Sequence, residues 1–282
     1  MGISVLSRIR DMLCSASFRP WLDRTPFRSI LRKAYYKLRP LAVPKLGRKS
    51  VRFLDLEATF LCRDAQELEL VETPLLDKGS GGEAHILRAL LESLRPGDSA
   101  LDVGANIGVH AIFMAKKAGE RGKVYAVEPE PTTCGILREN VRLNRLKNVV
   151  ALPLAFGAAT GEGELSSGMT ARNAYNLRGS GQSLGQRVQI MRGDDLFRSR
   201  GWTVPAVVKI DVEGFEGQVL EGLRDTIRQS ECRIICCEVH PELLPSGVTL
   251  ESILAGLSES GFARLVEVSR GRSLHLIAFR NS

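Results

Sequence analysis

Residues 98–110 constrain the fold of this chain more than any other stretch. A short apolar run with Ala100, Leu101 and Val103 is typical of a buried strand, and it stops at Gly104, after which a helical spacing of apolar residues begins. A strand, a glycine turn and a helix N-terminus together form a pocket for a nucleotide-like ligand, because glycine lets the backbone approach the ligand closely. The stretch therefore predicts an open α/β sheet with a ligand beyond the carboxyl ends of its strands.

The spacing within the turn indicates which ligand it suits. A dinucleotide fingerprint reads Gly-x-Gly-x-x-Gly and places a pyrophosphate on free helix N–H groups. Here the pattern is Asp102-x-Gly104-x-Asn106-x-Gly108, so an acid precedes the turn and Asn106 replaces the second glycine. A carboxylate at that position suits a cofactor with a cationic amino group better than a diphosphate. S-adenosylmethionine is such a cofactor.

A second apolar strand, residues 124–127, provides a second indication of a cofactor site. It ends in Glu128 and Pro129, and Glu128 follows Gly108 by twenty residues. An acid at the tip of a second strand accepts hydrogen bonds from ribose hydroxyls. Either element alone is a weak signal, but the two at this spacing predict a cofactor site. The expected contacts come from Asp102, Gly104, Asn106, Ile107, Gly108, Glu128 and Pro129.

Four motifs resemble those of one protein family. They are LDVGANIG at 101–108, AVEP at 126–129, ENVRLN at 139–144 and VKIDVEGFE at 208–216. On these motifs, residues 83–280 resemble the FkbM-type family of S-adenosylmethionine-dependent methyltransferases, and the KIDVEG element is the most specific. The resemblance implies O-methylation of a hydroxyl, often on a sugar, glycolipid or secondary metabolite. Residues 1–80 carry no such resemblance.

The order of expected elements predicts the fold class and three parts of the chain. Alternating strands and helices with a terminal hairpin predict a doubly wound α/β sheet of the Rossmann-like methyltransferase type, mostly parallel with one antiparallel C-terminal strand. Residues 83–282 are expected to form this cofactor-binding domain. Residues 51–82 are expected to be a small β cap or linker, with strands near 51–56 and 67–71, and residues 1–50 a basic extension.

Positive charge is concentrated in the extension. Residues 1–50 hold 12 of the 39 Lys and Arg residues but only 2 of the 32 Asp and Glu residues, which leaves 27 against 30 for the rest. A near-neutral domain argues against a specific nucleic-acid groove. The apolar spacing of residues 3–13 suits a helix on an anionic membrane, and equally a helix docked on the protein itself. Peripheral membrane contact through residues 1–50 is therefore one of two expectations.

Cysteine usage and hydropathy bear on the compartment. The six cysteines form no C-x-x-C pair and no zinc spacing, and no apolar run is long enough to span a bilayer. This favours reduced thiols in a cytoplasmic protein, attached at most to the periphery of a membrane.

The segment after the third expected strand, residues 148–154, departs from the usual methyltransferase pattern. Many such enzymes place an acid there to hold the adenine amino group, but this chain has Ala155 and Phe156. Phe156 is expected to be an apolar wall for the adenine. Further on, two paired strands near 162–166 and 187–191 flank a glycine-rich loop, 168–185, which is expected to be a lid over the acceptor or simply disordered. Its polar contacts would be Arg172, Asn173, Tyr175, Asn176 and Arg178.

The catalytic group is expected at the same edge of the sheet. Methyl transfer is an in-line displacement that requires alignment, and a neutral hydroxyl must also lose its proton to a carboxylate or histidine. Asp211, Glu213 and His240 are the candidates, with Lys209 beside them. If the strand end is extended, the first two carboxylates point the same way and raise each other's pKa. The alternatives are a helix cap at Glu213-Gly214, an ion pair of Lys209 with an acid, and a divalent metal bound by the Asp/Glu/His group.

Four further polar residues have weaker signals. Glu83 and His85 lie on an expected helix, 83–94, that packs beside the pocket in related proteins, but exposed helix positions are the preferred interpretation. His110 and His275 fall in apolar surroundings and are expected to be structural.

Two rival functions remain open from the sequence. A nicotinamide-dependent dehydrogenase would use a similar fold, but Asn106 and the absence of a Tyr/Lys or Ser catalytic group count against it. A non-catalytic Rossmann-like module could act through the basic extension on a membrane or RNA, but the retained acids Asp102, Glu128, Asp211 and Glu213 disfavour it.

Overall fold

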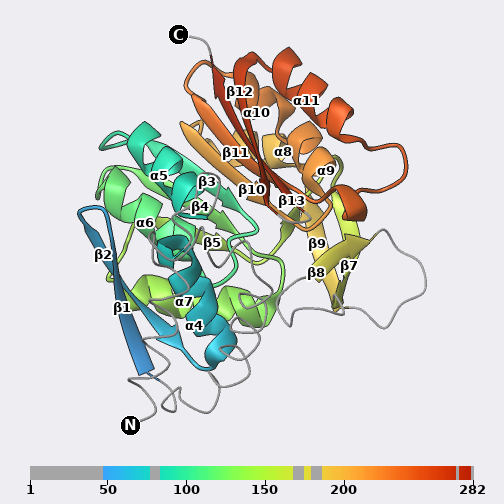
Figure 1. Cartoon of the computed structure of the whole chain (residues 1–282). Helices are drawn as coiled ribbons and strands as arrows, with labels where there is room; N and C mark the ends of the chain where they lie inside the picture. Colours follow the sequence, from blue (N-terminus) through green and yellow to red (C-terminus); the bar gives the residue numbers. More distant parts are fainter. Residues whose placement is uncertain (1–46, 77–82, 168–174, 179–185, 271–272, 281–282) are drawn as a thin grey trace, which may run out of the picture.

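The computed structural model describes residues 47–76, 83–167, 175–178, 186–270 and 273–280 (Figure 1). Most of the basic extension and most of the expected lid, including Arg172 and Asn173, lie outside the described residues. The expectations for those segments therefore stay predictions.

A seven-stranded sheet forms the centre of the molecule. Its spatial order is β12-β13-β11-β10-β3-β4-β5, and β13 is antiparallel to both of its neighbours whereas the other pairings are parallel. The expected mostly parallel sheet with one antiparallel C-terminal strand is confirmed. The bounds are β3 (Ser99–Val103), β4 (Lys123–Val127), β5 (Val149–Leu152), β10 (Val207–Asp211), β11 (Ile234–Val239), β12 (Phe262–Arg270) and β13 (Ser273–Arg280). The strand order reverses between β3 and β10, which is where ligands bind in such sheets.

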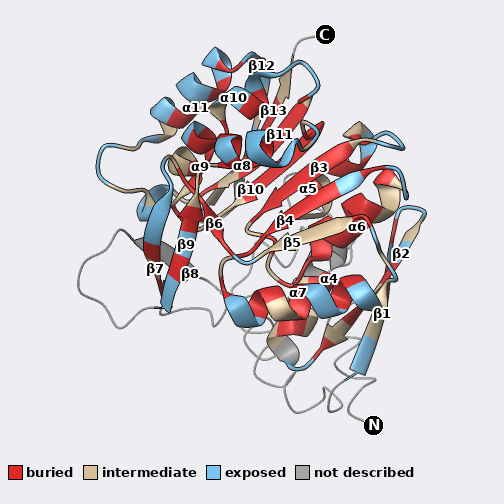
Figure 2. Ribbon diagram, turned by 180° about the vertical axis from the view of Figure 1, so that it is seen from behind, coloured by how far each residue is buried: buried red, intermediate tan, exposed pale blue. Residues whose placement is uncertain are grey.

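Alternate side chains of the strands enter two cores, one on each face of the sheet. Ala100 packs in one core and Leu101 in the other, because successive strand residues point to opposite faces. The first core is covered by α5 (Glu83–Ser93), α6 (Val109–Ala118) and α7 (Pro131–Leu143), and the second by α8 (Gly193–Arg200), α9 (Glu216–Gly222), α10 (Arg224–Arg228) and α11 (Leu250–Glu259). Figure 2 shows the buried strands between helices whose outer faces are exposed.

The segment before the sheet corrects one expectation. β1 (Gly47–Phe53) and β2 (Leu56–Cys62) form an antiparallel hairpin, but the strand expected near 67–71 is wrong, because those residues belong to α4 (Ala65–Leu76). Asp64 explains the helix: its Oδ1 accepts the N–H groups of Gln66 at 2.8 Å and Glu67 at 2.9 Å. This is N-terminal capping, with an acid three residues later, and it outweighs a short alternating pattern.

Asn140 of α7 and Asn144, directly after the end of this helix, attach the hairpin to the main domain. The Oδ1 atom of Asn140 accepts the N–H of Leu61 at 2.9 Å, and its Nδ2 donates to the carbonyl of Ile107 at 2.9 Å. Asn144 accepts the N–H of Thr59 at 3.0 Å and donates back to its carbonyl at 2.6 Å. The edge of β2 is thus satisfied by side chains, and the same contacts hold the turn that contains Ile107.

A second, four-stranded sheet stands beside the central one, in the order β6-β9-β7-β8. Its strands are β6 (Ala155–Phe156), β7 (Gly161–Ser167), β8 (Tyr175–Arg178) and β9 (Gln186–Met191). The expected pairing of residues 162–166 with 187–191 is confirmed as the antiparallel pair β7–β9. β8 lies inside the segment expected to be a loop, so that segment is not loop throughout.

Asp194 stabilises the start of a helix other than its own. α8 begins after Arg192 without a side-chain cap. Oδ1 of the buried Asp194 instead accepts the N–H of Thr226 at 2.8 Å, and its Oδ2 accepts that of Asp225 at 3.0 Å. These bonds lie in the first turn of α10, which follows α9 at Leu223.

Two observations concern the compartment. None of the described helices combines the length and apolar character needed to cross a membrane. Cys62, Cys134, Cys232, Cys236 and Cys237, the cysteines of the described segments, are buried and form no disulfide with one another.

Replacement of Asn140 with alanine is expected to lower the free energy of unfolding by about 2–3 kcal/mol, because the N–H of Leu61 and the carbonyl of Ile107 both lose their partner. Urea denaturation measures the change. The neighbouring exposed residue supplies the control: Glu139→Ala removes only a surface ion pair with Arg63 and should cost less than about 1 kcal/mol. Equal losses in the two variants would contradict the bridging role of Asn140.

Candidate functional site

A pocket that opens to solvent lies at the carboxyl ends of β3, β4 and β10. Among the expected cofactor residues, Gly104, Asn106, Glu128, Pro129 and Phe156 line it, whereas Asp102, Ile107 and Gly108 are buried outside its wall. The remaining lining residues are Val103, Val127, Ala155, Leu165, Asp211, Val212, Glu213 and Phe215.

The turn after β3 is held by Glu128. Its Oε2 accepts the N–H of Asn106 at 2.9 Å and its Oε1 accepts the N–H of Glu130 at 3.0 Å. Asn106 has a φ of 49°, in the left-handed region that asparagine tolerates better than most residues. This conformation accounts for Asn at the position of the second fingerprint glycine.

Gly104 is required by the neighbouring strand. A Cβ atom at this residue would lie 1.8 Å from the carbonyl oxygen of Asp211, and its φ is +78°. The sequence predicts that this glycine admits a ligand close to the backbone. In the structure, the space that a side chain at Gly104 would need is taken by the carbonyl group of Asp211 at the end of β10.

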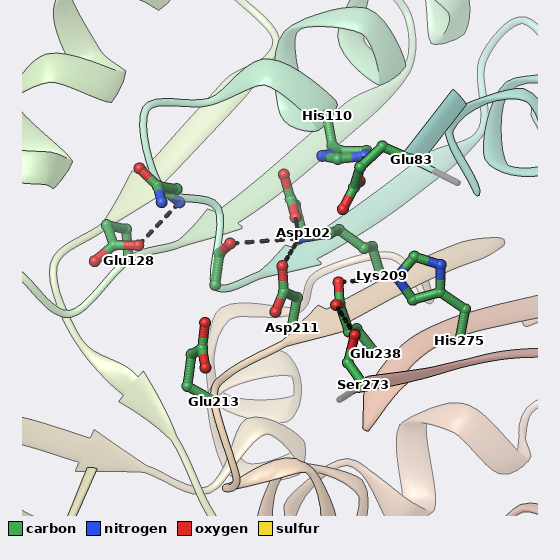
Figure 3. Close-up of polar contacts among 12 residues, drawn as sticks. Glu83, Asp102, His110, Glu128, Lys209, Asp211, Glu213, Glu238, Ser273 and His275 are labelled. Carbon is green, nitrogen blue, oxygen red and sulfur yellow. Dashed lines mark hydrogen bonds and ion pairs between the residues drawn. The ribbon is translucent and has the colours of Figure 1, made fainter. Parts of the chain in front are cut away.

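Glu128 is nearly buried, with 7% of its surface exposed. Burial raises the pKa of its carboxyl to about 7, although the two N–H groups that donate to it act in the opposite direction. The carboxylate sits at the tip of β4 beside the turn, as the sequence predicts (Figure 3).

Lys209 lies beneath the pocket and joins three groups (Figure 3). Its Nζ is 3.2 Å from Oδ2 of Asp211 and 3.7 Å from Oδ1 of Asp102, and it donates to the carbonyl of Gly104 at 3.5 Å. Asp102 is completely buried, and within the described part of the chain its oxygens make no hydrogen bond. Burial disfavours the charge of Lys209, but the carboxylates of Asp211 and Asp102 outweigh it and hold its pKa above the ordinary value. Lys209 therefore forms an ion pair with neighbouring acids, which is the alternative that the sequence offers to a catalytic role.

Asp211, Glu213 and His240 come together at the edge of the pocket. One ligand-type atom of each lies within 4.8 Å of the others. Asp211 ends β10, and Glu213 has a φ of 53°, so the expected extended strand end is wrong. The carboxylates converge because the chain turns here. Asp211 and Glu213 line the pocket, whereas His240, just before the 3₁₀ helix η1 (Pro241–Leu243), lies behind it.

The protonation of this group is set by burial and by charge. Burial raises the pKa values of Asp211 and Glu213, against the opposing charges of Lys209 and His240 respectively. Burial alone would lower the pKa of His240, but its bond to Glu216 and the charges of Asp211 and Glu213 raise it to about 9. The ring is therefore cationic at neutral pH. The spacing would permit a metal ion, but the ring already acts as the cation among these carboxylates.

Several contacts near the site were missed from the sequence. The Glu83 side chain is only 14% exposed, so the preferred exposed position is wrong; its Oε2 lies 3.4 Å from Nε2 of His110. Glu238 pairs with His275 at 3.0 Å and accepts a bond from Ser273 at 2.6 Å. Burial raises the pKa of Glu238, but the contact with His275 outweighs it and brings the pKa to about 2.

Known proteins that are similar to this chain are methyltransferases. The model of the methyltransferase FkbM domain matches residues 102–263, more than half of the chain. Hexuronic acid methyltransferase AglP of Haloferax volcanii is 34% identical over 171 residues, which are 60% of this chain and 66% of AglP, slightly under two thirds. The 31-O-demethyl-FK506 methyltransferase FkbM of Streptomyces tacrolimicus is 28% identical over 221 residues, 67% of this chain and 83% of that protein.

The Gly104→Ala substitution is expected to destabilise the protein by more than about 3 kcal/mol, because the added methyl overlaps the Asp211 carbonyl and the backbone is left-handed. Thermal unfolding of the purified variant measures the loss. Gly97→Ala is the matched control: its φ is +93° but nothing lies within 4 Å of the new atom, so the left-handed backbone alone should cost about 1–2 kcal/mol. Similar losses at both positions would contradict the close approach of β10.

Proposed function

The chain belongs to the FkbM family of S-adenosylmethionine-dependent methyltransferases, and from this premise we propose that it methylates a hydroxyl of a sugar, glycolipid or secondary metabolite. The names of the two relatives support this acceptor class, since one is a hexuronic acid methyltransferase and the other a 31-O-demethyl-FK506 methyltransferase. The observation that carries the proposal is one pocket lined both by Glu128 and by the carboxylates of Asp211 and Glu213.

The residues of the pocket fit the cofactor. Each carboxylate oxygen of Glu128 already accepts one backbone N–H and has capacity for a ribose hydroxyl as well. Ala155 and Phe156 offer an apolar wall to the adenine, and Gly104 and Asn106 present backbone near the methionine part. S-adenosylmethionine, when bound, supplies a methyl group on a cationic sulfur, and the nearby carboxylates favour that charge.

Glu213 is the proposed proton acceptor for the hydroxyl. Both Glu213 and Asp211 face the pocket, and both have raised pKa values, but Asp211 is committed to Lys209 at 3.2 Å. A carboxylate with raised proton affinity is the better base near neutral pH. His240 is cationic and holds no free site for that proton, so its proposed role is to face Glu213 as a counter-ion.

Lys209 and Asp102 are proposed positioning residues. Through its three contacts Lys209 fixes Asp211 relative to the carbonyl of Gly104, and Asp102 balances its charge from below. In-line transfer depends on such alignment. Ile107 and Gly108 are proposed to shape the turn without touching the ligand, since both are buried outside the pocket wall. No step in this scheme requires a divalent metal.

The affinity for S-adenosylhomocysteine is expected to depend on pH through Glu128. Ribose hydroxyls donate to the ionised carboxylate, so affinity should be level above its pKa of about 7 and fall by up to about tenfold per pH unit below it. Calorimetric titration at several pH values measures this. Glu128→Gln, which cannot ionise, should bind more weakly and with a nearly constant affinity. An equal slope in both proteins would contradict the role of Glu128.

Methyl transfer should depend on Glu213 and Asp211 more than cofactor binding does. With labelled methyl donor and a panel of hydroxylated glycans and uronic acids, the wild type should label at least one acceptor. On that acceptor, Glu213→Gln is expected to lower the transfer rate by roughly 10²–10⁴-fold, the usual contribution of acid–base catalysis. Asp211→Asn, which removes the partner of Lys209 and not the proposed base, should lower the rate less.

Binding of S-adenosylhomocysteine controls for damage to the pocket and should change only a few-fold in both variants. Full transfer activity in Glu213→Gln would sink the assignment of the proton acceptor. Absence of any binding to the wild type would overturn the proposed function itself.

A further inference from the structure

Glu216 is a fully buried carboxylate that lies outside the pocket wall and begins α9. We infer that Glu216 is a positioning residue, which sets the proton acceptor Glu213 through two contacts, one to the backbone of Gly214 and one to the ring of His240. This inference rests on the proposed function, because it assigns to Glu216 the control of the proposed base. It concerns a residue that the sequence places only within a longer motif.

The first contact fixes the turn that carries Glu213. Oε1 of Glu216 accepts the N–H of Gly214 at 2.9 Å. Glu213 and Gly214 both have positive φ, 53° and 102°, and a Cβ atom at Gly214 would lie 2.5 Å from the carbonyl oxygen of Leu243. A non-glycine residue keeps such a conformation only where surrounding contacts impose it. The bond from Gly214 to Glu216 is one of those contacts.

The second contact fixes the cation beside Glu213. The same Oε1 atom lies 2.9 Å from Nδ1 of His240, so this nitrogen carries a proton and donates it. The other ring nitrogen, Nε2, is then directed at Oε2 of Glu213, 3.6 Å away, and at Oε1 of Glu238, 3.8 Å away. A carboxylate that fixes one nitrogen of a histidine and thereby aims the other is a recurrent arrangement in catalytic sites.

Carboxylates from every packed element face His240. They are Asp211 of β10, Glu213 in the following turn, Glu216 of α9 and Glu238 of β11. Asp211 has Lys209 as a partner, and Glu238 has His275 and Ser273. Among the described residues, Glu213 and Glu216 are therefore the members of this set whose counter-charge comes chiefly from His240. Glu216, the nearer of the two, orients the ring toward Glu213.

The Glu216→Gln variant separates charge from shape. The glutamine oxygen can still accept the N–H of Gly214, but the side chain no longer carries the negative charge that favours the imidazolium. In full-length protein with labelled histidine and glutamate side chains, NMR titration follows the ring of His240 and the carboxyl of Glu213, which are assigned by loss of their signals in His240→Gln and Glu213→Gln. The wild-type ring should titrate at about 9. In Glu216→Gln its midpoint should fall by about one pH unit, which still leaves the ring cationic where Glu213 titrates. The midpoint of Glu213 should therefore fall as well, because the like charge of Glu216 is gone.

The outcomes decide the inference separately from the proposed function. A downward shift of both midpoints supports it, whereas an unchanged midpoint of His240, or an unchanged or raised midpoint of Glu213, overturns it. Glu221→Gln, on the same helix with an exposed side chain, should leave both midpoints unchanged. If Glu216→Gln does not fold, His240→Asn tests the ring side, and the Glu213 midpoint must rise there. These titrations need neither acceptor nor methyl donor, so failure of methyl transfer alone would count against the proposed function and not against this coupling.

Discussion

The ion pair network around Lys209 is the interaction on which the site depends. One buried ammonium group faces Asp102 of β3, Asp211 of β10 and the carbonyl of Gly104. A buried lysine remains charged only where fixed carboxylates compensate for its lost hydration. The network therefore requires β3 and β10 to be neighbours in one register, and Lys209 lies opposite Asp102 in that pairing. The same cation thus holds the turn after β3 against Asp211 at the end of β10.

Around this cation, some carboxylates lie below or behind the pocket and others face it. Asp102, Glu216 and Glu238 are engaged below or behind the pocket, while Glu128, Asp211 and Glu213 face it. Burial raises the proton affinity of a carboxylate, nearby like charges add to this effect, and a fixed cation lowers it. Burial prevails at Glu213, whereas at Glu238 it is outweighed by the contact with His275, which is why the pKa values of these two acids are displaced in opposite directions.

Local patterns in the sequence predicted the sheet and half of the pocket. The run from Asp98 to His110 and the strand tip at Glu128 are contiguous signals, and the structure places Gly104, Asn106, Glu128 and Phe156 in the pocket wall. What the sequence could not supply depends on contacts between distant segments. The role of Glu216 arises from its distance to His240, 24 residues away, and Asn140 joins α7 to a hairpin 79 residues earlier. The helix α4 was a different failure, because the capping acid Asp64 was present and the alternating pattern was preferred to it.

The pairing of β9 with both β6 and β7 has a consequence for the rigidity of the pocket. Leu165 on β7 and Phe156 on β6 both line the pocket, and β9 is hydrogen-bonded to both strands. The two apolar walls therefore belong to one sheet, and neither can move relative to the other without breaking backbone hydrogen bonds. Their separation is fixed by strand pairing as well as by side-chain packing.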